Sequence, residues 1–115
     1  MKDINGEFEY KGKTYKLVFN LNVMQDIQEK YGTLGKWGEL TDGKKGEPSA
    51  KAVIDGFTAM INEAIDMENE DNGTNIKPYT NRQVGRIVTG AVLKNMIQKL
   101  SETVIASTKS DEKNE

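Results

Sequence analysis

Hydrophobic and polar residues alternate along the first part of the chain. Tyr15, Leu17 and Phe19 fall on one face of an extended segment, and two further aromatic residues precede them across a Lys-Gly-Lys turn. Alternation with a period of two is typical of a strand with one buried face, and a glycine-containing turn between two such runs is typical of a hairpin. The pattern predicts a β-hairpin over residues 4–19.

Beyond residue 19 the apolar positions recur at spacings of three and four, which is typical of an amphipathic helix. Asn20 stands where a helix N-cap is expected. Gly32 stands where a glycine commonly closes a helix, because its backbone tolerates a left-handed conformation. These signals predict a helix over residues 21–31.

A shorter apolar stripe follows this helix. Leu34, Trp37 and Leu40 share one helical face behind Thr33, a second capping residue. Glycines interrupt the stretch and leave it able to open, and tryptophan is enriched at the centres of protein interfaces. We therefore predict a protein-interaction site at Leu34, Trp37 and Leu40. The alternative is that Trp37 packs in the core, as apolar residues at helical spacing commonly do.

Two longer helical patterns follow at 49–68 and 81–100, and a capping residue and a polar loop precede each of them. The last residues are charged and polar, which predicts a disordered tail over 101–115. The order of elements predicts an α+β fold in one helix-rich domain over 1–100. An N-terminal β-hairpin would pack on three to four helices.

Composition narrows the possible functions. The chain has 115 residues, a net charge of −2, no cysteine and no histidine. The missing residue types exclude disulfides, cysteine nucleophiles, the Ser-His-Asp triad and the usual zinc ligands. Neither a signal-peptide pattern nor an apolar run of about 18 residues is present, so we expect no membrane segment. We predict a soluble intracellular protein that is not an enzyme and carries no cofactor.

One acidic segment is a candidate metal site. Residues 68–73 are similar to the start of a calcium loop, with oxygen ligands at alternate positions and glycine sixth. The twelfth position of that count is Tyr79, where a calcium loop requires a bidentate carboxylate. We therefore expect a solvated helix end here and no metal.

The segment from Gly43 to Gly46 matches the GXXG pattern with which KH domains clamp an RNA backbone. Glu47 and Pro48 follow directly, where an RNA phosphate would meet a carboxylate. Together with the net negative charge, this disfavours nucleic-acid binding and favours a flexible surface loop. A small RNA-binding module that uses this loop is kept as the alternative function.

Three short segments carry a family resemblance. They are Tyr15-Lys16-Leu17-Val18-Phe19-Asn20, the helical segment Leu21-Asn22-Val23-Met24-Gln25-Asp26-Ile27-Gln28-Glu29-Lys30-Tyr31-Gly32, which ends in Lys-Tyr-Gly, and Thr80-Asn81-Arg82-Gln83-Val84-Gly85. In this order, over about residues 4–100, the chain resembles the tail assembly chaperones of long-tailed bacteriophages that infect Gram-positive bacteria.

The resemblance implies a non-enzymatic function in the cytoplasm of the bacterial host. A protein of this family would bind the long, largely helical tape measure protein and keep it soluble until tail tube subunits polymerise around it. The tail tube protein and a second copy of the chain are further implied partners. The family brings no catalytic residues to this sequence. Another small phage structural or adaptor protein remains an alternative.

Overall fold

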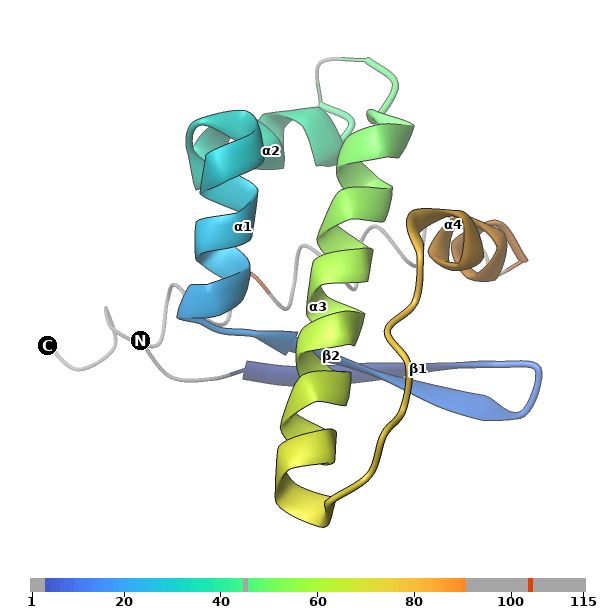
Figure 1. Ribbon diagram of the computed structural model, residues 1–115. Helices are drawn as coiled ribbons and strands as arrows, with labels where there is room; N and C mark the ends of the chain where they lie inside the picture. The colour runs from blue at the N-terminus through green and yellow to red at the C-terminus, as the bar shows by residue number, and fades with distance from the viewer. Residues whose placement is uncertain (1–3, 45, 91–103, 105–115) are drawn as a thin grey trace, which may run out of the picture.

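The computed structural model describes residues 4–44, 46–90 and 104. The chain forms strands β1 (Ile4–Tyr10) and β2 (Lys13–Phe19) and helices α1 (Leu21–Tyr31), α2 (Leu34–Thr41), α3 (Ala50–Asn72) and α4 (Asn81–Gly90) (Figure 1). The predicted α+β fold, an N-terminal hairpin with four helices, is confirmed. The part of the last helix predicted over 91–100 and the tail predicted over 101–115 lie outside the described residues, apart from Val104.

The hairpin forms where the alternation predicts it. Its strands pair antiparallel, with Phe8 opposite Tyr15. Lys11 and the following glycine both have positive φ, which matches the tight turns that suit the twist of a hairpin. Phe8 stacks on Tyr15 and meets the ring of Phe57 edge-on, with centroids 6.0 Å apart. The hairpin therefore packs against α3, which crosses it in Figure 1.

Helix α1 begins and ends as its caps predict. The side chain of Asn20 accepts hydrogen bonds from the backbone N–H groups of Asn22 and Val23, at 3.1 and 3.2 Å. At the other end Gly32 has φ 88° and donates its N–H to the carbonyl of Gln28. Asn20 also donates to Glu63 of α3 at 2.7 Å, so the same residue caps α1 and ties it to α3.

Helix α2 is held to α3 by Trp37. The indole Nε1 donates to the carbonyl of Ala52 at 2.9 Å, and the side chain is 2% exposed. The ring lies over Gly56, where an added Cβ would come within 2.5 Å of the indole Cζ2. A glycine on α3 therefore makes the room that Trp37 occupies.

Helix α3 is longer than the sequence predicted. Its last apolar-stripe residues lie near residue 68, yet the helix continues to Asn72 and ends at Gly73, which is left-handed with φ 65°. The extension is polar, and a helix that is already nucleated needs no buried face to add another turn. Asn69 stabilises the following connection, because its side chain bonds both the N–H and the carbonyl of Ile76.

The core lies where the hairpin and the four helices meet. Its buried residues are Leu17, Phe19, Val23, Ile27, Trp37, Ala52, Val53, Phe57, Met60, Ile61, Val84 and Val88. Every element except β1 contributes at least one of them, and Phe8 of β1 packs against the cluster. No helix within the described ranges has the length and apolar character needed to cross a bilayer.

Candidate functional site

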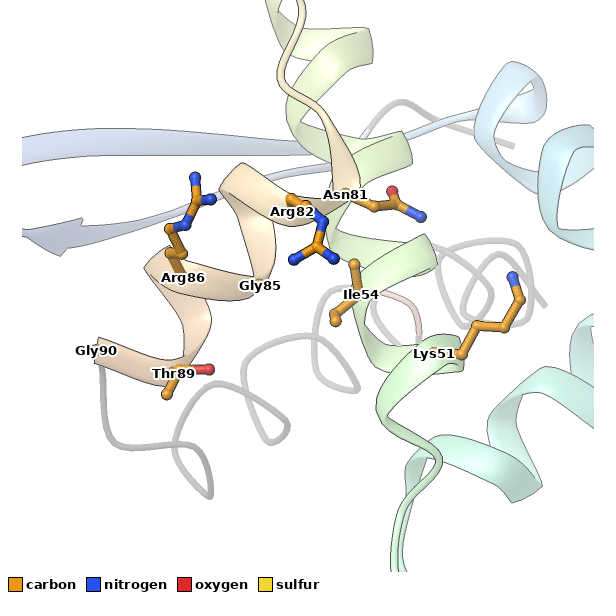
Figure 2. Close-up of a pocket in the computed structure, with 8 residues that line it drawn as sticks. All are labelled: Lys51, Ile54, Asn81, Arg82, Gly85, Arg86, Thr89 and Gly90. Atoms are coloured by element: carbon orange, nitrogen blue, oxygen red, sulfur yellow. The ribbon is translucent and has the colours of Figure 1, made fainter.

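An open groove of about 760 Å³ lies between α3 and α4 (Figure 2). Its described lining consists of Lys51, Ile54, Asn81, Arg82, Gly85, Arg86, Thr89 and Gly90. Ile54 comes from α3 and most of the remaining wall from α4. A Cβ added to Gly85 would lie 3.4 Å from the Cδ1 atom of Ile54, so the two helices approach closely at the floor of the groove.

The start of α4 is fixed by two sets of hydrogen bonds. Thr80 and Gln83 form a reciprocal capping box, with backbone-to-side-chain distances of 2.9 and 3.2 Å. Asn62 of α3 bonds both the N–H and the carbonyl of Tyr79, at 2.8 and 2.9 Å. The entry into α4 is therefore clamped to α3, which positions the polar side of α4 beside the groove.

A buried carboxylate lies next to one end of the groove. The side chain of Asp55 is 2% exposed and accepts hydrogen bonds from the Tyr31 hydroxyl at 2.7 Å, from Lys51 Nζ at 2.9 Å and from Asn81 Nδ2 at 2.9 Å. The ammonium of Lys30 lies 3.8 Å away. These contacts join α1, α3 and α4 at one residue, which we call the Asp55 junction.

The junction holds its charges in a defined state. Burial by itself raises the pKa of Asp55, but hydrogen bonds from Lys51, Tyr31 and Asn81 and the charge of Lys30 outweigh it, so the pKa lies below the usual value. Burial and the bond to Asp55 raise the pKa of the Tyr31 phenol well above its usual value. Asp55 is therefore ionised and Tyr31 protonated at neutral pH.

The cationic side chains in the described lining of the groove differ in whether they have an ion-pair partner. Lys51 is paired with Asp55. Arg82 and Arg86 are exposed, and neither forms an ion pair within the part of the chain that the structure describes. In Figure 2 the guanidinium of Arg82 lies over the groove near Ile54, and Arg86 points away from it along α4. Among the described residues, the groove therefore has one arginine without an ion-pair partner over its apolar floor, Arg82, and a second, Arg86, that borders it and points away.

This arrangement is suited to binding. The described lining contains no carboxylate, and its lysine is already engaged by Asp55. Guanidinium groups bind carboxylates in a bidentate geometry, and an apolar floor favours an aliphatic surface. Among the described residues, no group of three or more acidic side chains is placed to hold a metal ion.

The predicted interaction residues lie elsewhere. Leu34 and Leu40 are half-buried and pack against the core, and Trp37 is in it. Trp37 therefore lies in the core of the fold, as the alternative interpretation predicts. Figure 1 shows α2 on one side of α3 and α4 on the other, so these residues do not line the groove. Whether they contact a partner stays a prediction.

The Gly43–Gly46 loop also lies apart from the groove lining. Gly43 and Gly46 have positive φ values of 74° and 123°, and the N–H of Lys44 bonds the Asp42 side chain. The described residues contain a two-stranded sheet, whereas KH domains are built on three strands. The hydrogen bond between Asp42 and Lys44 forms a local turn at the start of this loop.

Sequence reasoning missed the groove and the Asp55 junction. One signal was available, because Asp55 interrupts an otherwise apolar run between Val53 and Phe57, and an acid in such a place requires partners. A second signal was that Lys30, Tyr31 and Asn81 belong to the segments that carry the family resemblance.

Comparisons of this chain with protein-family models, with characterised proteins and with solved structures found no match.

Proposed function

We propose that this chain is a tail assembly chaperone of a long-tailed bacteriophage. It binds the tape measure protein in the cytoplasm of the bacterial host, keeps it soluble and leaves it as tail tube subunits polymerise. The protein carries out no chemical reaction in this role. Its contact with the tail tube protein, or with a second copy of the chain, is secondary to binding the tape measure protein.

One observation supports this proposal more than any other. Two segments that carry the family resemblance meet in space, because Lys30 and Tyr31 of the first and Asn81 of the second all contact Asp55. The residues that follow Asn81 include Arg82 and Gly85, which line the groove. The resembling segments thus form one structural unit beside a candidate binding surface, as expected of segments that serve a common function.

The shape and chemistry of the groove suit a helical client. A long helical protein that lacks its tube exposes apolar rows, which promote aggregation unless another protein covers them. Proteins commonly bind such a row in a groove between two helices that has an apolar floor and charged residues at its rim. The groove between α3 and α4 has both features.

Coexpression tests the proposal. The probe is the long helical protein encoded nearest to this chain's gene, produced in bacteria alone, with this chain, and with an unrelated acidic protein of similar size. We expect it to be insoluble alone and with the unrelated protein, and to remain soluble and copurify with this chain. Equal solubility under all three conditions, or no copurification, would refute the proposed function.

A further inference from the structure

We infer that the groove between α3 and α4 docks an amphipathic helix whose apolar row is flanked by carboxylates. This inference rests on the proposed function for the source of that helix, a segment of the client. Its chemistry follows from the groove itself.

The positive charge of α4 beside the groove favours an acidic partner helix. Arg82 and Arg86 are one helical turn apart on α4, exposed, and without an ion-pair partner in the described ranges. Side chains four residues apart on a helix lie about 5–6 Å apart at Cβ. A helix in the groove can place one carboxylate against Arg82, which lies over the floor, and a guanidinium binds a carboxylate through two parallel hydrogen bonds. Arg86 points away from the floor and can bind a second carboxylate on the outer flank of that helix.

The second argument is the floor. Ile54 supplies an aliphatic surface beneath Arg82, and Gly85, which faces Ile54, adds no side chain to the α4 wall. The described length of α4, 10 residues, corresponds to about 15 Å at 1.5 Å per residue. Two to three turns of a partner helix can lie along such a wall, with one apolar side chain in each turn facing the floor.

Acidic residues outnumber basic ones in two other hollows of the described surface. Glu7, Glu68 and Asp71 line a cavity of about 550 Å³ between the hairpin and the end of α3. Asp26, Glu63 and Asp66 belong to another, of about 240 Å³, between α1 and α3. A helix that carries carboxylates would be repelled from both, because like charges at close range are unfavourable. Charge therefore favours the arginine-lined groove over these two hollows, and the smaller hollow that carries Lys13 and Lys16 against Glu68 has a volume of about 150 Å³.

The same residues fit an RNA strand less well. Proteins that bind single-stranded nucleic acid stack its bases on aromatic side chains along a cationic groove. The described lining of this groove contains no aromatic residue, and its floor is aliphatic. An apolar row with flanking carboxylates satisfies the floor and the arginines together, whereas a phosphate backbone satisfies the arginines alone.

The test uses the full chain and a synthetic helical peptide of about 18 residues, long enough for several turns. Leucines form its apolar row, glutamates flank them at spacings of four, and a matched peptide carries lysine at every glutamate position. Fluorescence anisotropy of the labelled peptides measures binding. We expect the glutamate peptide to bind and the lysine peptide not to bind.

Paired charge reversals locate the site. The double variant Arg82→Glu/Arg86→Glu should weaken binding of the glutamate peptide by about tenfold or more, because it replaces attraction with repulsion. The control Lys36→Glu/Lys77→Glu changes the net charge equally at exposed lysines outside the groove and should stay within about twofold of the original chain. All four positions are exposed, and circular dichroism checks that each variant is folded.

Three results would overturn the inference. They are equal binding of the two peptides, equal losses in the two double variants, and binding of a labelled oligouridine through Arg82 and Arg86 in place of the glutamate peptide. The coexpression assay separates this inference from the proposed function. If Arg82→Glu/Arg86→Glu still keeps the tape measure protein soluble, the docking site is wrong and the function stands. If the original chain fails to do so but binds the glutamate peptide through these arginines, the function is wrong and the site stands.

Discussion

Replacing Asp55 by asparagine tests whether the Asp55 junction stabilises the fold. The substitution preserves the shape of the side chain but removes its charge and one of its two acceptor oxygens. Tyr31 and Lys51 donate to Oδ2 of Asp55 and Asn81 donates to Oδ1, so an amide NH2 group in place of either oxygen faces at least one of these donors. The variant leaves these donors in place with too few acceptors.

The size of the effect follows from burial. Hydrogen bonds to a charged group contribute about 1.5–3 kcal/mol each, and removing one partner of a buried ion pair costs about 3–5 kcal/mol. The side chains of Lys30 and Lys51 are 55% and 76% exposed, so water can solvate them after the change. The loss should therefore lie at the lower end, at about 2–3 kcal/mol in the free energy of unfolding.

Urea unfolding at neutral pH measures this loss. The emission of Trp37, the single tryptophan of the chain, reports unfolding because its side chain is buried. Asp66→Asn is the matched control, since it removes the same charge from an exposed position on the same helix and should change stability by less than about 0.5 kcal/mol. Equal effects of the two substitutions would refute the role given to the junction.

Acidity provides an independent check. The pKa of Asp55 is lowered in the folded state, so its ionised form stabilises the fold above the unfolded pKa of about 3.9, and this contribution is lost as pH falls through the lower folded value. The difference in stability between the original chain and Asp55→Asn should be constant above about pH 5 and shrink below about pH 4. A difference that stays constant at still lower pH would contradict the assigned direction of the pKa shift.

Four further substitutions have defined outcomes in thermal or urea unfolding. Gly56→Ala should destabilise the fold by about 1–3 kcal/mol, because its Cβ would lie 2.5 Å from the indole of Trp37, whereas Gly38→Ala, with open space around it, should be neutral or stabilise by up to about 1 kcal/mol. Equal effects of the two would contradict the close approach. Trp37→Ala should cost about 3–5 kcal/mol as a core truncation, and a loss below about 1 kcal/mol would contradict its burial. Asn20→Ala should cost about 1–2 kcal/mol, because it removes both cap bonds and the bond to Glu63, and an unchanged midpoint would contradict that role.

Local signals predicted the elements well. The hairpin was predicted from alternation and from a turn that contains glycine, and α1 from its caps, because each of these signals lies within a few residues of the structure that it specifies. The end of α3 was misplaced since its last turn is polar and has no apolar stripe to mark it. Helix boundaries at polar ends are set by the capping glycine, here Gly73, more than by hydrophobic periodicity.

The site could not be predicted in the same way. The hydrogen bonds at Asp55 join residues 24 and 26 positions apart, and the groove exists because α4 lies against α3. The burial of Trp37 likewise depends on Gly56, a residue on another helix. Such contacts follow from the packing of distant segments, which neither periodicity nor caps encode.

The Asp55 junction gives residues in the segments that carry the resemblance a structural role. Lys30, Tyr31 and Asn81 lie in the resembling segments, yet their side chains are directed at a buried carboxylate that joins three helices. In this chain the trio and its aspartate fasten α1, α3 and α4 together. The choice of partner is instead open at exposed neighbours such as Arg82 and Arg86, which can change without loosening the fastening. Substitutions at Arg82 and Arg86 should therefore change partner binding while α1, α3 and α4 stay joined at Asp55.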